Sequence, residues 1–222
     1  MAIFDDKVRK QIGDILTKLG DRVNLLYFTQ EMECGICKDI HEFLNEFASL
    51  SDRIGLTTFD FVKDRDKAEH YKIDKIPAIL LLDKNDNDTG IRFFGLPGGY
   101  EINSFIQGLM EVSGVKEPLS QGAAEMIKKI DRDVHIQVFI SLTCPYCPAA
   151  VSAAHRIALE NPRVRADMVD AGVFPQLAVK YNVSSVPKTI INEKIEIIGG
   201  SPLKNSSRRR LRPEGPAALA FE

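Results

Sequence analysis

The sequence predicts an α/β protein made of two copies of one small layered unit, each with a central mixed four-stranded sheet and flanking helices. Two observations support this prediction. Cys144 and Cys147 lie 110 residues after Cys34 and Cys37, and the same offset relates several tyrosine, proline and apolar positions. Within each copy, short apolar runs alternate with stretches of helical periodicity. A fixed offset shared by many positions indicates duplication of a whole structural unit.

Both copies place their elements in the same order. A helix leads into an apolar strand, and a cysteine pair follows where that strand meets a second helix. A second strand and a short helix ending at a tyrosine come next, and two strands joined by a turn complete the sheet. One parallel crossover followed by an antiparallel hairpin, with helices on the sheet, makes a layered α/β unit. The first helix and the four strands are expected at residues 4–19, 23–29, 55–62, 78–83 and 90–95 in the first copy, and at 121–130, 134–140, 164–170, 188–192 and 195–200 in the second.

The sequence also indicates where the copies meet and where the second one ends. The segment "VKEPLSQG" is a natural linker, so we expect domains at residues 1–115 and 116–222. The first copy ends with the amphipathic helix "YEINSFIQGLMEVSG", whereas the second ends in "SPLKNSSRRRLRPEGPAALAFE", where prolines interrupt any helix. We expect an atypical, solvated tail from about residue 201. A second sheet without its last helix would leave apolar surface open, so a homodimer is one expectation.

Composition excludes several classes of protein. A hydrophobic content of 44% and a charged content of 27% are those of an ordinary globular protein. The net charge of −2 gives no field that would favour nucleic acid or an anionic membrane surface. No apolar run reaches the ~18 residues of a membrane span. The amino-terminal segment has helical periodicity and lacks the apolar core and cleavage site of a signal peptide. We therefore expect a cytoplasmic protein.

All four cysteines belong to two CxxC pairs, and three kinds of chemistry use such pairs. Zinc knuckles usually place their pairs ~15–20 residues apart, whereas these pairs lie in separate copies of a duplicated unit. A purely structural disulfide between cysteines three residues apart closes too small a loop to add much stability. Reversible thiol–disulfide exchange is the typical role of CxxC near a βαβ pattern. Redox chemistry is therefore the favoured interpretation.

The position of each pair suits a redox role. Each first cysteine, Cys34 or Cys144, is expected at or near the start of a helix, where unpaired N–H groups and the helix dipole favour a thiolate. A lowered thiol pKa supplies the nucleophile. The second cysteine, Cys37 or Cys147, should lie within bridging distance and be more buried than the exposed first one. Pro145 suits the first helical turn because it has no N–H to leave unpaired.

These features resemble the thioredoxin fold. Each CxxC follows a strand, precedes a helix and is followed, 43 residues after its first cysteine, by the proline of "KIPAI" or "SVPKT". The tetrapeptide "CPYC" is that of glutaredoxins, and "CGIC" resembles the thioredoxin motif less closely. Two complete copies resemble the tandem protein disulfide oxidoreductases found mostly in thermophilic bacteria and archaea. The resemblance runs from Ile3 to about Gly200.

The resemblance implies a second set of functional residues. In this family the proline of the Ile/Val-Pro pair is cis and faces the cysteines, which we carry over to Pro77 and Pro187. The preceding residue presents backbone groups to a bound polypeptide, which implies that Ile76 and Val186 bind substrate.

The chain also departs from the thioredoxin pattern. It contains no tryptophan, and Glu33 and Thr143 precede the first cysteines where thioredoxins have one. Phe28 and Val138 stand six residues before the first cysteines, where thioredoxins keep a buried acid. The sequence therefore assigns no group to proton transfer.

Nearby polar residues offer partial substitutes in the first copy. Glu31 or Glu33 could handle protons, and His41 could stabilise a thiolate one turn earlier, although solvated acids and surface histidines are the commoner case. Negative charge at Glu31 and Glu33 should raise the thiol pKa of Cys34. Thr143 is neutral, and Pro145 pre-forms the turn beside its cysteine. We expect the second copy to dominate disulfide reduction.

The resemblance implies a protein disulfide oxidoreductase with Cys34, Cys37, Cys144 and Cys147 as catalytic residues. It acts on protein disulfides, binds no cofactor or metal itself, and receives electrons from NADPH through a thioredoxin-reductase-like flavoenzyme. A glutathione-dependent glutaredoxin is one alternative. Another is an electron-relay module for a peroxide-reducing flavoprotein, which resembles this double fold but usually retains one CxxC. A holdase that binds unfolded polypeptides on its Ile/Val-Pro surfaces is the alternative from a different class.

Overall fold

The computed structural model describes residues 3–30 and 34–199. The chain divides into two compact units, the first made of residues up to 96 with 106–116, and the second of residues 97–105 with those from 117 onward. The segment 97–105 thus belongs to the first copy in sequence and to the second unit by its contacts. The tail from residue 201 lies outside the described residues, and the homodimer suggested by that tail stays a prediction.

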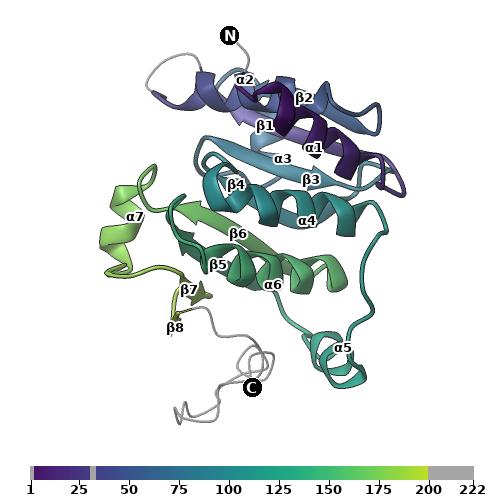
Figure 1. Ribbon diagram of the computed structural model, residues 1–222. Helices are drawn as coiled ribbons and strands as arrows, with labels where there is room; N and C mark the ends of the chain where they lie inside the picture. Colours follow the sequence, from purple (N-terminus) through teal and green to yellow (C-terminus); the bar gives the residue numbers. More distant parts are fainter. Residues whose placement is uncertain (1–2, 31–33, 200–222) are drawn as a thin grey trace. The chain divides into compact units, whose positions relative to one another are not determined.

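The first unit follows the predicted order of elements. Its helices and strands are α1 (Asp6–Leu16), β1 (Val23–Thr29), α2 (Cys37–Ala48), β2 (Ile54–Asp60), α3 (Arg65–His70), β3 (Ala78–Leu82) and β4 (Asp88–Phe94). β1 pairs in parallel with β2 and antiparallel with β3, and β4 pairs antiparallel with β3. In Figure 1, α1 and α2 cover one face of this sheet and α3 lies behind the other.

Two boundaries in the first unit differ from the expected ones for identifiable reasons. α1 begins at Asp6 because the carboxylate of Asp5 accepts a hydrogen bond from the N–H of Val8, at 2.8 Å, and so caps the helix. β2 ends at Asp60 because its carboxylate accepts hydrogen bonds from the N–H groups of Val62 and Lys63, which turns the chain out of the strand.

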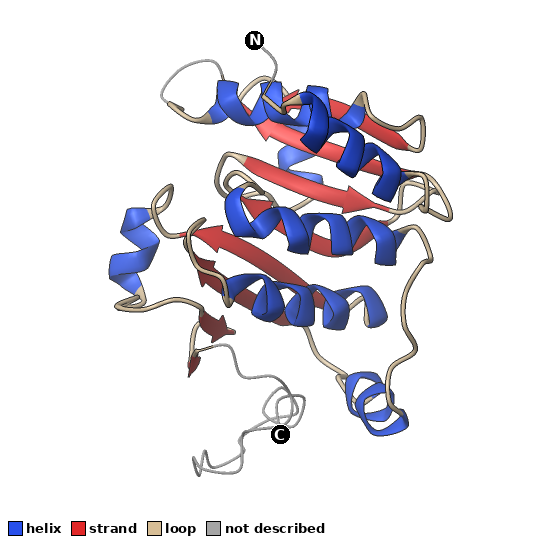
Figure 2. Ribbon diagram, viewed as in Figure 1, coloured by secondary structure: helices blue, strands red, loops and turns tan. Residues whose placement is uncertain are grey.

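The second unit repeats this arrangement. It contains α5 (Gln121–Lys128), β5 (Val134–Ile140), α6 (Cys147–Glu160), β6 (Val164–Asp170), α7 (Pro175–Lys180), β7 (Lys188–Ile191) and β8 (Ile195–Ile198). β5 pairs in parallel with β6 and antiparallel with β7, and β8 pairs antiparallel with β7. α6 packs on β5 and β6, and α5 packs on α6 (Figure 2). The predicted fold class, two α/β units with mixed four-stranded sheets, is confirmed.

The connection between the two copies differs from the expected single helix. A 3-10 turn, η1 (Gly99–Glu101), precedes α4 (Ile102–Val112). η1 and the first turn of α4 fall in the segment 97–105 and pack against α6. The later part of α4 approaches β3, since a Cβ added at Gly108 would lie 3.3 Å from the Leu81 side chain.

Each sheet is the centre of an apolar core. All five residues of β3 are buried, and the aromatic rings of Phe28, Phe47 and Phe93 are fully buried in the first unit. In the second unit β5 has a similar role, with Phe139 and Ile140 fully buried. No helix in the described part of the chain is long and apolar enough to cross a membrane.

Candidate redox sites

The first CxxC pair lies where β1 hands over to α2. Cys34 and Cys37 form a disulfide, with their Cα atoms 5.4 Å apart. Cys34 is half-buried and Cys37 is buried, in the expected order. The helix begins at Cys37 with Ile36 as its N-cap, so the first cysteine precedes the helix instead of capping it. The N–H of Cys37 donates a hydrogen bond to the carbonyl of Cys34 at 3.3 Å, which closes this turn.

The second pair repeats this geometry at the junction of β5 and α6. Cys144 and Cys147 form a disulfide with Cα atoms 5.5 Å apart. Cys144 is only 7% exposed, less than we expected of a nucleophile, and Cys147 is fully buried. α6 also begins at its second cysteine, so Pro145 precedes the helix, while Pro148 occupies its first turn without breaking it.

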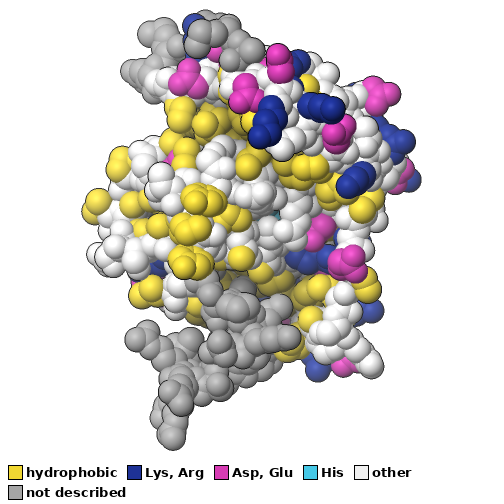
Figure 3. Space-filling model, in the orientation of Figure 1, with side chains coloured by type: hydrophobic (Ala, Val, Ile, Leu, Met, Phe, Trp, Pro, Cys, Tyr) yellow, Lys and Arg dark blue, Asp and Glu magenta, His cyan; other side chains and the backbone are white. Residues whose placement is uncertain are grey.

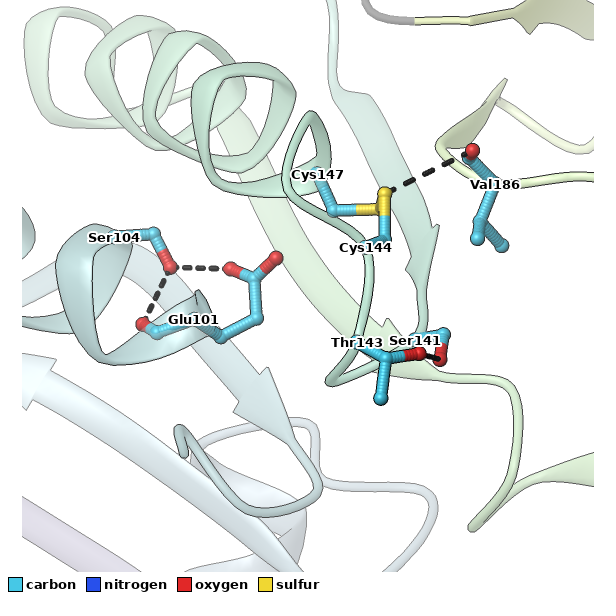
Figure 4. The surroundings of a disulfide bond; sticks show 7 residues. All are labelled: Glu101, Ser104, Ser141, Thr143, Cys144, Cys147 and Val186. Atoms are coloured by element: carbon cyan, nitrogen blue, oxygen red, sulfur yellow. Dashed lines mark hydrogen bonds between the residues drawn. A yellow bond between two sulfur atoms is a disulfide. The ribbon is translucent and has the colours of Figure 1, made fainter. Parts of the chain in front are cut away.

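Both predicted cis peptide bonds are confirmed. They join Ile76 to Pro77 and Val186 to Pro187, immediately before β3 and β7. In the second unit, Cys144 Sγ lies 3.8 Å from the backbone carbonyl oxygen of Val186 (Figure 4). The structure thus brings the predicted substrate-binding backbone next to the predicted nucleophile in this unit.

Side chains below the first pair hold the start of α2. The hydroxyl of Tyr27 donates a hydrogen bond to the Cys37 carbonyl at 2.7 Å, and burial raises the pKa of Tyr27 to about 12. The ring of His41 stacks on Tyr27, with centroids 6.0 Å apart, and its Nε2 lies 3.5 Å from the hydroxyl of Thr58. These contacts fix His41 one turn after Cys37. Glu31 and Glu33, the other predicted candidates, lie outside the described residues.

A buried carboxyl group near the second pair was not predicted from the sequence. Glu101 is fully buried, and burial together with the charge of Asp170 raises its pKa from the ordinary 4.5 to about 7. The Ser104 hydroxyl donates a hydrogen bond to Oε2, whereas Oε1 has no hydrogen-bond partner among the described residues. η1 packs on α6, and in Figure 4 the Glu101 carboxyl points toward the side that carries Cys147.

Asp170 shows that equivalent positions in the two copies are not equivalent electrostatically. It ends β6, as Asp60 ends β2. Burial raises the pKa of Asp170. The pKa of Asp60 is lowered, chiefly by the hydrogen bond from the N–H of Lys63. Only the second unit therefore combines two buried acids, and Glu101 from the segment 97–105 makes the difference.

One signal in the sequence could have revealed Glu101. It precedes Phe105 by four residues and Leu109 by eight, so it falls on the apolar stripe of the predicted helix. A charge on the buried face of an amphipathic helix indicates a special environment. The departure noted in the sequence is real, since Phe28 and Val138 are both buried apolar side chains.

Buried cations support the cis-proline segment in both units. In the second unit, Lys188 follows Pro187 directly, and its ammonium donates hydrogen bonds to the carbonyls of Tyr181 and Asn182, at 2.6 and 3.2 Å. It also pairs with Glu196 at 2.8 Å. These bonds tie the end of α7 to β7.

In the first unit a different strand supplies the cation. Arg92 of β4 is buried and donates a hydrogen bond to the carbonyl of Tyr71, at 3.5 Å, while pairing with Asp88 at 2.6 Å. The carbonyl that ends the short helix is thus held in each copy, but by residues that are not equivalent in sequence.

Comparison with known proteins agrees with this geometry. The thioredoxin family model matches residues 6–107, and a second thioredoxin-domain model matches residues 134–211. A solved structure of the alkylhydroperoxide reductase AhpF from Enterococcus faecalis is 36% identical, with a TM-score of 0.85, over 90% of this chain and 96% of that one. The chain belongs to the tandem thioredoxin-fold oxidoreductases.

Other members of these tandem thioredoxin-fold oxidoreductases are more distant. A protein disulfide oxidoreductase from Aeropyrum pernix has a TM-score of 0.83 at 27% identity, over 90% of this chain and 88% of that one. Among curated proteins, NADH dehydrogenase of Bacillus subtilis is 26% identical over 190 residues, and the corresponding alkyl hydroperoxide reductase protein of Staphylococcus aureus is 28% identical over 155 residues. These matches cover 86% and 70% of this chain but only 34% and 28% of those proteins.

Proposed function

We propose that this tandem thioredoxin-fold oxidoreductase reduces, oxidises or isomerises protein disulfides at two sites, Cys34–Cys37 and Cys144–Cys147, one in each of the domains 1–115 and 116–222. The observation that carries the proposal is the contact of 3.8 Å between Cys144 Sγ and the carbonyl oxygen of Val186. It joins a cysteine that can exchange disulfides to backbone that can bind a polypeptide.

The exchange proceeds in two steps, here written for the second site in its reduced form. The thiolate of Cys144 attacks one sulfur of the partner's disulfide, so a mixed disulfide forms and the partner's other sulfur leaves as a thiolate. The thiolate of Cys147 then attacks Cys144 Sγ, closes the Cys144–Cys147 disulfide and releases the partner's second sulfur. Two electrons pass to the partner, and the reverse sequence oxidises it.

The second step needs a base, because the buried thiol of Cys147 must lose its proton before it attacks. Glu101 suits this role because its pKa of about 7 lets it accept and return a proton near neutral pH. Its Oε1 makes no hydrogen bond to a described residue, which leaves that oxygen available. We assign Glu101 as the proton acceptor of the second site.

The polypeptide partner would bind along the cis-proline segments. An extended chain can pair with exposed backbone groups, as in strand addition to a sheet edge. The backbone of Val186 with Pro187 in the second unit, and of Ile76 with Pro77 in the first, is assigned to this role. Because the pairing uses backbone, it holds the partner's disulfide near the cysteine without requiring one particular sequence.

Electrons would enter from a nicotinamide cofactor through a flavoprotein, with no cofactor bound to this chain. A thioredoxin-reductase-like flavoenzyme using NADPH is the proposed donor. A second candidate function is electron relay to a peroxide reductase, favoured by the 36% identity to the E. faecalis protein. We place the protein in the cytoplasm, where paired thiols stay reduced, with protein partners and without nucleic acid or membrane lipid.

Insulin reduction tests the proposed function. The full chain should reduce insulin with dithiothreitol as the electron donor, and replacing all four cysteines by alanine should abolish this activity. Glutathione should support much less turnover, whereas a glutaredoxin would use it well. If the alanine variant still suppresses aggregation of unfolded proteins while the native chain reduces no insulin, the protein is a holdase and the proposal is wrong.

A further inference from the structure

Two tyrosine rings are exposed around the second redox site. Tyr146 lies between the two cysteines and is 73% exposed, and Tyr100 of η1 is 48% exposed. Apolar side chains also reach the surface elsewhere, as Figure 3 shows for one face. Single exposed apolar side chains are common, so exposure alone indicates little. The backbone around Tyr100 is more informative.

Tyr100 is held firmly beside the loop that carries Cys144. Its N–H donates a hydrogen bond to the carbonyl of Leu142 at 3.0 Å, and its own carbonyl accepts one from the Asn103 side chain at 2.9 Å. Gly99 has a φ of +55°, and a Cβ there would collide with the Leu142 carbonyl oxygen. Only glycine therefore permits this close approach. Because Leu142 and Cys144 are two residues apart, their Cα atoms are separated by at most about 7 Å.

The surroundings of the second pair are uncharged. Residues 141–150, "SLTCPYCPAA", contain no charged side chain. In the first unit, Ile36 stands in place of Tyr146, and the exposed, charged Lys38 and Asp39 follow the pair directly. The two redox sites thus present different surfaces to a partner, although their cysteine geometry is nearly the same.

We propose that Tyr100 and Tyr146 form an aromatic docking surface at the second site, which selects polypeptides whose disulfide is flanked by uncharged, apolar residues. The inference rests on the proposed function, because the occupant is the disulfide-bearing segment that must reach Cys144. Tyrosine suits such a surface, since it offers a large rigid contact area at a low cost in conformational entropy. A charged flanking residue would lose water against the rings without gaining an ionic partner.

The test uses the full chain with Cys34→Ser and Cys37→Ser, so that only the second site turns over. Two disulfide-closed peptides that differ only in their flanking residues, leucine in one and glutamate in the other, serve as substrates. The leucine peptide should be reduced with a kcat/KM roughly fivefold or more higher, the size expected for one well-packed aromatic contact. The preference should appear in KM more than in kcat.

Substitutions at the rings then separate docking from a general loss of structure. Tyr100→Ser should reduce the preference to below twofold, and Tyr100→Phe should retain it because the ring is kept. Val115→Ser is the matched control, since Val115 is 42% exposed and belongs to the first unit. It should leave the preference intact.

The outcomes separate the two proposals. If the Cys34→Ser, Cys37→Ser protein reduces neither peptide nor insulin, the proposed function fails for this site, and the docking surface fails with it. If it reduces both peptides equally, or if Tyr100→Ser keeps the preference as Val115→Ser does, disulfide exchange stands and the docking surface is wrong.

Discussion

The charge of Asp170, at the end of β6, contributes to the raised pKa of Glu101 in η1, and both carboxyl groups are buried in the second unit. Two acids in one poorly solvated region cannot both ionise easily, so one of them keeps its proton to a higher pH. Near neutral pH Glu101 is therefore close to half-ionised. A group in that state can both take up and return a proton.

Glu101→Gln should slow disulfide reduction at the second site by about tenfold or more, because general acid–base groups typically contribute at least that much. The loss should be greatest above pH 7, where Glu101 would act as a base, and should shrink as the pH falls to 5. Insulin reduction by the Cys34→Ser, Cys37→Ser protein as a function of pH measures this. A variant whose rate falls by the same factor at every pH would show that Glu101 only maintains structure.

The same substitution should change stability in a defined pH window. A carboxyl group whose pKa is higher in the folded chain stabilises the fold below its unfolded value of about 4.3, and this contribution is lost as the pH rises through 7. The loss is about 3 kcal/mol, since one pKa unit corresponds to about 1.4 kcal/mol. Relative to the native chain, Glu101→Gln should therefore gain stability between pH 5 and pH 8, as measured by urea unfolding. A constant difference between the two proteins across this range would contradict the raised pKa.

Alkylation of the reduced protein near pH 6 should label Cys34 and Cys144 before Cys37 and Cys147. The second cysteines are the more buried of each pair, and a fully buried thiol such as that of Cys147 is the least accessible to a reagent. Mass spectrometry after short exposure to iodoacetamide gives the order. Earlier labelling of Cys37 or Cys147 would reverse the assigned roles of nucleophile and resolving thiol.

The second site should carry most of the insulin reduction. Its neutral Thr143 and its nearby base Glu101 both favour exchange, whereas the acids that precede Cys34 in sequence should raise that thiol's pKa. Cys144→Ser should therefore lose several times more activity than Cys34→Ser when both are assayed at pH 7. The opposite ranking would refute the electrostatic comparison while leaving the redox assignment in place.

Lys188→Met should destabilise the chain by about 1–3 kcal/mol, because the carbonyls of Tyr181 and Asn182 would lose their buried hydrogen-bond donor. Lys188→Arg should recover part of the loss, since it keeps the charge and the donors. Urea unfolding of the full chain provides the measurement. Thr189→Val, at the next position of β7, serves as a control and should cost less, because it removes no cation.

Much of the fold could be predicted from the sequence because the relevant signals are local or repeated. The strands β1, β5 and β6 match the expected ranges to the residue, since each is a continuous apolar run between turn residues. The cysteine pairs and the two cis-prolines could be located because copying preserved their spacing. Helix starts were less accurate, since a cap such as Asp5 depends on hydrogen bonds that apolar periodicity does not show.

Glu101 and the two buried cations depend on contacts between residues far apart in the chain. Glu101 approaches Asp170 only because the segment 97–105 joins the second unit. Arg92 and Lys188 hold equivalent helix ends from different strands, a relationship that no shared offset in the sequence could reveal. Burial sets both the pKa of an acid and the need of a carbonyl for a donor, and burial exists only once distant segments have packed together.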